Sequence, residues 1–442
     1  MKLLKYGFLL IVALIVGVAL YLHKDVTKEH QYVSSENCQD CHETYYQGWK
    51  STLHPKMFRP VTSPDDIQGD FSLNDPAVTF KKEDIQYVVG NKWEQVYVRM
   101  IDDEYYPFPA KWFISTQKWV PYKVKDWHET PMSTKCNGCH TTGFNQNTHE
   151  FNEYGIGCEA CHGPGSIHVQ NQKMKEKPAC TICHEVKEIN TLDIISKVDS
   201  SVCGQCHSRG TNIPYENKEE KGKFNFPVGI KPGDNLDTAF KPLTQQDDKK
   251  KKYWWGNGVS KNRHQEFADW NNSKHSKSLK LLLEKESPER GELKDECLEC
   301  HSTDYRFAKE GQKPNLKTAK YGVTCVACHD PHGFDKKLSL MQKGTFVCGG
   351  CHIDSMSFKA QSSGRKSHYP CPPSSVSCAD CHMPYIVTTG GDFTLRSHAF
   401  KVINPKDSKE YGLPNSCQNG GCHQDKSIEW AIEEFNEFYQ KE

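Results

Sequence analysis

The chain has 442 residues, 56 basic and 56 acidic side chains, and a hydrophobic fraction of 36% that is low for a globular protein. The balanced charge gives no general attraction to nucleic acid, and 11% aromatic residues are too many for a disordered chain. The unusual count is 21 Cys beside 21 His, which in a chain this long indicates metal chemistry and excludes a small disulfide scaffold.

The first predicted element is a membrane anchor within residues 1–24. Lys2 and Lys5 precede the apolar run Tyr6–Leu22, which spans about 25 Å as a helix, the short end for a membrane crossing. Lysines before the apolar run place the N-terminus in the cytoplasm and the rest of the chain on the periplasmic side of the membrane. We favour an uncleaved signal anchor over a removed signal peptide, because no small-x-small cleavage site clearly follows the run.

The cysteines form one repeated motif, Cys-x-x-Cys-His. Its nine copies are Cys38, Cys41 and His42; Cys136, Cys139 and His140; Cys158, Cys161 and His162; Cys180, Cys183 and His184; Cys203, Cys206 and His207; Cys297, Cys300 and His301; Cys325, Cys328 and His329; Cys348, Cys351 and His352; and Cys378, Cys381 and His382. This is the attachment pattern of haem c, in which two thiols bind the porphyrin and the next His binds the iron as proximal ligand. Zinc sites and structural disulfides also use paired cysteines, but neither explains a His after every pair.

A tenth copy, formed by Cys417, Cys422 and His423, has four residues between its cysteines. We predict that this Cys-x-x-x-x-Cys-His variant also binds haem, which gives ten covalently attached haems. The alternative is a disulfide between Cys371 and Cys417 that leaves Cys422 free. Cys371 is the one cysteine outside the ten pairs, and we predict an idle or buried thiol there.

The histidines outside the motifs are candidates for the second axial position of each iron. Two axial His suit electron transfer, whereas an open position allows a substrate to bind. Because His23 adjoins the anchor, ten spare His remain for ten irons, and we predict seven distal ligands: His54, His128, His168, His275, His332, His368 and His398. The sequence leaves open whether His30, His149 and His264 are distal ligands. One to three haems can therefore have Met, water or nothing opposite the proximal His.

The motifs form two groups of five, in predicted regions 25–207 and 297–442, and a connecting region at 208–296 has no attachment site. Ile85–Gly90 and Lys92–Ile101 predict a small antiparallel β-hairpin region near residues 85–108, because apolar and polar side chains alternate there. The charge run Asp247–Lys252 predicts a solvated loop. Helices are predicted within Lys274–Ser287 and Lys426–Tyr439. The expected fold is mainly α, with long loops, little regular structure and a core filled by haem.

Several segments resemble known multihaem cytochromes. Gly157–Val169 is similar to the tetrahaem cytochrome family that accepts electrons in hydroxylamine oxidation, as are Cys38–His54 and Lys135–Gly143. The sequence Gly-Val-Thr-Cys-Val-Ala-Cys-His-Asp-Pro-His-Gly after Tyr321 resembles cytochromes with doubled Cys-x-x-Cys-His motifs, as does Cys378–Pro384. The resemblance implies His168, His332 and His398 as distal ligands and a relation to multihaem nitrite and hydroxylamine enzymes. The chain lacks the Cys-x-x-Cys-Lys site of ammonia-forming nitrite reductases, which counts against nitrite reduction.

Together these patterns predict a membrane-anchored, exported decahaem cytochrome that acts as an electron carrier rather than an enzyme. The expected partners are a quinol-linked or periplasmic donor and a second redox protein as acceptor, with no nucleic acid and an open oligomeric state. One alternative is an oxidoreductase that acts on a small nitrogen or sulfur compound at one five-coordinate haem. Another is a subunit of an extracellular conducting filament. Haem propionates would make the loaded protein negatively charged, which favours basic docking partners.

Overall fold

The computed structural model describes residues 30–124, 126–175, 199–213, 223–284, 292–333, 347–352, 371, 376–389 and 392–439. Several predicted features lie outside these ranges: the N-terminal anchor, the distal ligand His368, and the whole fourth motif with its attachment residues Cys180 and Cys183 and its proximal ligand His184. The haem predicted for Cys180, Cys183 and His184 therefore stays a prediction from the sequence. Within the described ranges, no helix has both the length and the apolar character that a membrane crossing requires.

The largest regular element is a five-stranded antiparallel sheet whose strands follow chain order. They are β1 (Phe58–Pro60), β2 (Tyr87–Val89), β3 (Glu94–Ile101), β4 (Glu104–Phe113) and β5 (Lys118–Pro121). Asp102 and Asp103 join β3 to β4, and their φ angles of 47° and 62° suit a tight two-residue turn. The pairing of β2 with β3 confirms the predicted hairpin. The sheet extends beyond the predicted residues 85–108. The sequence did not indicate β1 and β5, because strands this short show no clear alternation of apolar and polar residues.

Both faces of this sheet are covered by apolar side chains. One cluster contains Ile67, Ile85, Val88, Tyr97, Phe108, Ala110, Trp112 and Trp119. The other contains Phe58, Val96, Val98, Tyr105 and Met132. Successive residues of β3 therefore point into opposite clusters, which explains why Glu94–Val98 is buried throughout where the sequence predicted one polar face.

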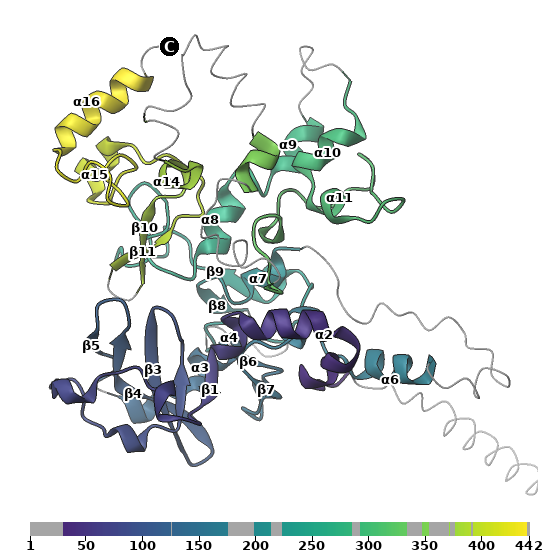
Figure 1. Cartoon of the computed structure of the whole chain (residues 1–442), viewed down its shortest axis with the longest axis vertical. Helices are drawn as coiled ribbons and strands as arrows, with labels where there is room; N and C mark the ends of the chain where they lie inside the picture. The colour runs from purple at the N-terminus through teal and green to yellow at the C-terminus, as the bar shows by residue number, and fades with distance from the viewer. Residues whose placement is uncertain are drawn as a thin grey trace, which may run out of the picture.

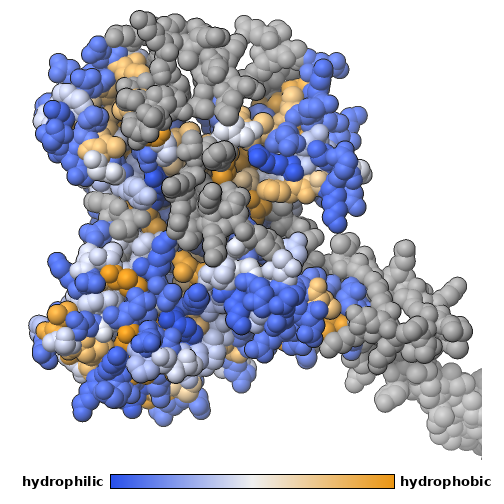
Figure 2. All heavy atoms as spheres, viewed as in Figure 1, coloured by the Kyte–Doolittle hydropathy of each residue, from blue (hydrophilic) through white to orange (hydrophobic). Residues whose placement is uncertain are grey.

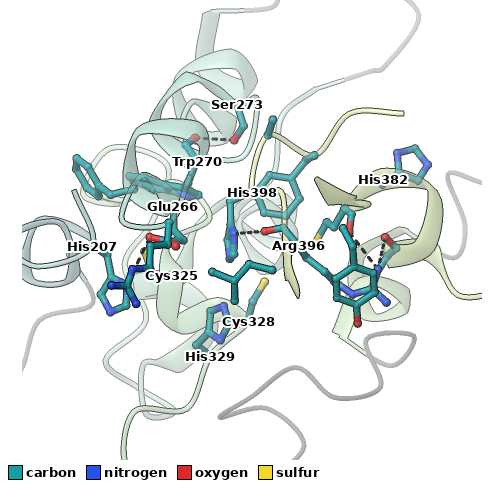
Figure 3. Close-up of a pocket in the computed structure, with 18 of the residues that line it drawn as sticks. His207, Glu266, Trp270, Ser273, Cys325, Cys328, His329, His382, Arg396 and His398 are labelled. Carbon is teal, nitrogen blue, oxygen red and sulfur yellow. Dashed lines mark hydrogen bonds and ion pairs between the residues drawn. The ribbon is translucent and has the colours of Figure 1, made fainter. Parts of the chain in front are cut away.

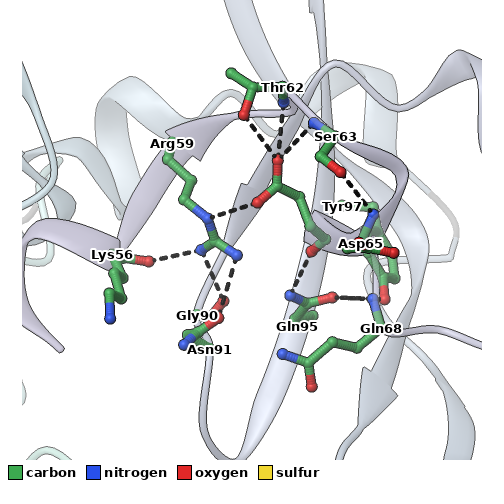
Figure 4. Close-up of polar contacts among 11 residues, drawn as sticks. Lys56, Arg59, Thr62, Ser63, Asp65, Gln68, Gly90, Asn91, Gln95 and Tyr97 are labelled. Carbon is green, nitrogen blue, oxygen red and sulfur yellow. Dashed lines mark hydrogen bonds and ion pairs between the residues drawn. The ribbon is translucent and has the colours of Figure 1, made fainter.

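A polar network fixes the loop after β1 to the sheet (Figure 4). Arg59 donates to the carbonyl oxygen of Lys56 at 2.9 Å, and its Nε lies 3.7 Å from the Asp66 carboxylate. The buried amide of Gln95 donates to the carbonyl oxygen of Asp66 and accepts from the backbone N–H of Gln68, both at 2.9 Å. The interior polar group is thereby satisfied, and the loop is held against β3.

The helices are short, and many of them carry a motif. The motif helices are α2 (Glu36–Ser51), α4 (Asn137–His140), α5 (Glu159–His162), α7 (Ser201–Gly204), α10 (Leu298–His301) and α14 (Cys378–His382). The others are α3 (Met132–Lys135), α6 (Ser166–Lys175), α8 (Glu266–Asn272), α9 (Ser278–Glu284), α11 (Thr303–Phe307), α15 (Pro405–Tyr411) and α16 (Ile428–Tyr439). α9 and α16 confirm the two helices predicted from apolar periodicity.

Three two-stranded sheets complete the regular structure of the described residues. They are β6 (Thr141–Thr142) with β7 (Glu153–Tyr154), β8 (Gly210–Asn212) with β9 (Phe240–Pro242), and β10 (Tyr385–Thr389) with β11 (Asp392–Arg396). The connecting region packs on the last of these, since Trp255 Nε1 donates to the carbonyl oxygen of Ile386 at 3.0 Å. The loop predicted at Asp247–Lys252 is largely exposed, but Asp248 is buried and accepts from the backbone N–H of Trp254 at 2.9 Å.

The elements form two ends joined by a middle layer (Figure 1). The sheet β1–β5 and α2 lie at one end, α9–α11 and α14–α16 lie at the other, and α7, α8, β8 and β9 lie between them. On the face drawn in Figure 2, the described surface is mainly hydrophilic, with small scattered apolar areas.

Candidate functional site

Most described motifs are built on about one turn of helix, whereas the tenth, at residues 417–423, is formed by turns and bends. In the third, fifth and seventh motifs, the backbone N–H of the His donates to the carbonyl oxygen of the first Cys, at 3.0, 2.9 and 2.9 Å. The motif His is the last residue of α4, α5, α10 and α14. Because one turn separates the first Cys from the His, the two thiols and the imidazole project from neighbouring positions.

Most of these side chains line one continuous cavity of about 2860 Å³, well above the roughly 300–1,000 Å³ of an ordinary ligand pocket. Both Cys and the His of the second, fifth, seventh, eighth, ninth and tenth motifs reach its wall, and Cys161 and Cys300 represent the third and sixth. Figure 3 shows part of this wall, with His329 and His398 on facing sides. The cavity therefore joins attachment sites from both groups of five.

Four motif His face a second His across a short gap. The ring centroids lie 6.3 Å apart for His42 and His168, 6.1 Å for His162 and His332, 6.0 Å for His329 and His398, and 6.0 Å for His352 and His275. Two metal–imidazole bonds of about 2.0–2.1 Å plus half of each ring add up to about this separation. The ring planes lie within 22–26° of parallel in the first three pairs and cross at 82° in the last. The spacing fits an iron bound by both rings.

The other nitrogen of several rings contacts an oxygen of the protein. Nδ1 of His301 lies 3.2 Å from the carbonyl oxygen of Ser278, and Nδ1 of His398 lies 3.2 Å from that of Arg396. Nδ1 of His207 lies 3.7 Å from the carboxylate of Glu266. Such contacts orient the imidazole and leave Nε2 for a metal.

Exclusion of water keeps several of these imidazoles neutral. It lowers the pKa of His54, His140 and His275 to about 4, and the charges of nearby His207, Arg263 and His352 act in the same direction. It also lowers the pKa of His398. A neutral imidazole has the free lone pair that a metal bond requires.

The structure places the remaining predicted ligands differently. His54 reaches the cavity wall on the side of His207, and so does His264, whose role the sequence left open. The His128 ring lies against that of Trp127, with centroids 3.4 Å apart, and is not part of the cavity wall, so its ligand role stays a prediction.

Two of the three histidines left open by the sequence lie elsewhere. Nδ1 of His149, a half-buried residue, lies 2.9 Å from a carboxylate oxygen of Glu104. His30 is half-buried at the beginning of the described residues.

Thiols of different motifs lie close to one another. The contacts join Cys38 to Cys158, Cys139 to Cys206, Cys203 to Cys325, Cys300 to Cys351, and Cys348 to Cys378. The fifth motif thus touches the second through Cys206 and the seventh through Cys203. It is one place at which the two groups of five meet, and the facing rings of His162 and His332 are another.

Basic side chains outnumber acidic ones beside the second motif. Glu94 forms ion pairs with Arg263 and, at 2.9 Å, with Lys111. Arg209 donates to the backbone carbonyl oxygen of Arg263 at 2.9 Å, and its guanidinium lies 4.7 Å from the ring centre of Tyr253. Partly buried cations in excess need an anion, and haem propionates are anions. No pattern in the sequence indicates this cluster, because its members are far apart along the chain.

The two alternative uses of the cysteines find no support in the part of the chain that the structure describes. All the cysteines there are free thiols, including Cys371 and Cys417. No three His, Cys, Asp or Glu side chains of the described ranges are grouped as a metal-ion site. Cys371 is half-buried in the cavity wall, where desolvation and the neighbouring Cys422 raise its pKa.

The cavity, the thiol pairs, the facing imidazoles and the excess cations all fit haem. They define a protein that would hold several covalently attached haems, with facing His pairs as candidate axial ligands at four of the described sites. Haem bound in this way supplies one-electron redox chemistry.

Comparison with known proteins gives the same class. The model of the family "Cytochrome c554 and c-prime" matches residues 115–163 and 261–330, and the "Doubled CXXCH motif" model matches residues 317–357. The structure of the outer cell wall cytochrome OcwA superposes with a TM-score of 0.75 and 30% identity, over 92% of this chain and 87% of OcwA. The chain belongs to the multihaem c-type cytochromes.

Two further relatives match less closely. Multiheme cytochrome MtrA of Shewanella baltica (strain OS185) is 29% identical over 101 residues, which are 23% of this chain and 28% of MtrA. The undecaheme cytochrome from the S-layer of Carboxydothermus ferrireducens has a TM-score of 0.52 and 21% identity, over 92% of this chain and 60% of that one. The latter similarity concerns the fold alone.

Proposed function

We propose that this chain is an exported decahaem cytochrome c that relays electrons between redox proteins. The observation that carries the proposal is the closeness of the attachment sites. Cysteines of neighbouring motifs lie side by side along the wall of one cavity. Haems held there fill the core, and the protein's own contribution is to fix their spacing and their axial ligands.

The proposed location is the outer side of the cytoplasmic membrane. The apolar run Tyr6–Leu22 behind two lysines supports an anchor there, or a cleaved leader in an exported form. OcwA is named as an outer cell wall protein, which supports export. Donor and acceptor are then redox proteins of the cell envelope, one of them linked to quinol oxidation.

The first and tenth motifs are the proposed places of electron entry and exit. Cys41 and Cys422 are the exposed cysteines among the described ones, so their haems are the ones that partners reach. The propionates add negative charge to a neutral polypeptide, which favours partners with a basic docking surface.

An electron count tests the relay. The full chain, purified from membranes, is titrated coulometrically and then mixed rapidly with a one-electron acceptor. We expect ten electrons per chain and complete reoxidation by the acceptor alone. Uptake of no electrons, or reoxidation only by a small nitrogen or sulfur compound, would contradict the proposal.

A pair of matched variants tests the path. One double variant, Cys203→Ala with Cys206→Ala, removes the fifth site, where the two groups meet. The other, Cys417→Ala with Cys422→Ala, removes a terminal site. Both should lose one haem by mass. Only the first should slow electron transfer between the two groups, and equal rates in both variants would refute the proposed junction.

A catalytic role is the second candidate. Arg263 and His140 both line the cavity, so the excess positive charge there could hold a small oxyanion beside the second haem. Electron paramagnetic resonance (EPR) of the oxidised protein decides. A high-spin ferric signal that shifts when nitrite, hydroxylamine or sulfite is added supports catalysis, and an all-low-spin spectrum that ignores these compounds eliminates it.

A further inference from the structure

A carboxylate stands behind the proximal His of the fifth motif. Glu266, the first residue of α8, accepts from the backbone N–H of His264 through Oε1 at 3.2 Å. Its Oε2 lies 3.7 Å from Nδ1 of His207, and Figure 3 shows the two side chains facing each other. This Oε2 atom is buried and accepts no hydrogen bond within the described residues, so His207 is the donor within its reach.

Cationic and imidazole side chains surround Glu266. His264, Arg209 and Arg263 lie close to one another on this side of the cavity, and Arg209 donates to the backbone carbonyl oxygen of Arg263 at 2.9 Å. The group that faces Nδ1 of His207 is therefore a carboxyl group in basic surroundings.

At the sixth and seventh sites, Nδ1 of one axial His contacts a neutral group, whereas Nδ1 of His332, which faces His162, lies 3.9 Å from the Asp330 carboxylate. Nδ1 of His301 faces the carbonyl oxygen of Ser278, and Nδ1 of His398 faces that of Arg396. A carboxylate accepts a hydrogen bond more strongly than a carbonyl group and makes the imidazole a better electron donor to its metal. A more electron-rich ligand favours ferric over ferrous iron and lowers the reduction potential.

We propose that Glu266 is a positioning residue that binds Nδ1 of His207 and lowers the reduction potential of the fifth haem below those of the sixth and seventh haems. The inference rests on the proposed electron relay. Because the fifth motif touches the second and the seventh, every electron that passes between the two groups through it enters this haem. When a ferrous sixth or seventh haem passes its electron to the ferric fifth haem, the neighbour is oxidised and the fifth iron is reduced. This transfer is thermodynamically uphill.

The test is a redox titration of the haem-loaded full chain, followed by EPR and optical absorption. In Glu266→Gln, the equilibrium constant for reduction of one low-spin haem should rise at least tenfold. This corresponds to an upward shift of its reduction potential by about 59 mV for one electron. The EPR signal of that haem should also move. Glu284→Gln is the control, because Glu284 is exposed on α9, pairs with Lys280 at 3.7 Å and is not part of the cavity wall. No potential should shift in that variant.

Two results overturn the inference. One is a Glu266→Gln protein with its full haem content whose potentials match those of Glu284→Gln. If Glu266→Gln loses a haem, Glu266→Asp decides, because the shorter carboxylate keeps the charge and weakens the contact. A raised potential in Glu266→Asp supports the inference, and an unchanged one refutes it. Absence of haem from the wild-type chain would instead defeat the proposed relay itself.

Discussion

His398 offers a sharp test of axial ligation. Its ring centroid lies 6.0 Å from that of His329, the planes are inclined by 26°, and Nδ1 is held 3.2 Å from the carbonyl oxygen of Arg396. The variant His398→Ala removes the imidazole opposite His329 and leaves both cysteines of the seventh motif in place. The haem should therefore stay attached and lose one axial ligand.

The size of the effect follows from the number of motifs. With ten attachment motifs in the chain, the loss of one ligand converts one iron in ten from low spin to high spin. EPR of the oxidised variant should show a new high-spin ferric signal that integrates to about one iron per chain. The low-spin intensity should fall by about one-tenth.

The control is His149→Ala. His149 contacts Glu104 through Nδ1 and faces no motif His in the described part of the chain, so its removal should leave the spectrum unchanged. A His398→Ala spectrum identical to that of His149→Ala, with the full haem mass retained, would refute ligation by His398.

Three further predictions concern the polypeptide itself. Phe108 is 2% exposed, and its ring stacks on that of Phe80 with centroids 4.2 Å apart in the core of the sheet. Phe108→Ala should therefore lower the free energy of unfolding by about 3–5 kcal/mol in denaturant titrations. Leu73→Ala, at a side chain that is 54% exposed, should change it little. Burial raises the pKa of Asp269 from 3.8 to about 7, so the folded chain binds a proton that the unfolded chain releases between these values. This contribution to stability is complete below about pH 4 and lost as the pH rises through 7, and Asp269→Asn should show a smaller fall in Tm from pH 5 to pH 8 than the wild type. The rings of Trp430, in α16, and His423 pack with centroids 4.9 Å apart. Trp430→Ala should free α16 and speed tryptic cleavage at Lys426 several-fold. An unchanged cleavage rate would mean that this contact does not hold α16.

The attachment residues could be predicted because covalent chemistry dictates their local spacing. Axial partners are different, since tertiary packing decides which rings meet. His332 follows His329 by three residues, yet its ring faces His162 of another motif. The sequence identified His332 as a ligand candidate but contained nothing that names its partner.

Some features of the site had no local signal at all. Glu94, Lys111 and Arg263 come from two strands and the connecting region, and only the fold brings their charges together. Glu266 lies in a short helix without apolar periodicity. The number of spare histidines favoured a ligand at His128, whose ring lies against Trp127, and nothing in its sequence surroundings indicates that contact.

The most direct test of the whole account is the intact mass of the denatured, purified chain. Thioether-linked haem survives unfolding, so we expect the polypeptide mass plus ten haems, whether or not the N-terminal segment has been removed. A mass equal to that of the bare polypeptide would contradict the central claim. A mass with nine haems would mean that one site is empty, and peptide mapping would then show whether it is the fourth motif, at Cys180 and Cys183, or the tenth, at Cys417 and Cys422.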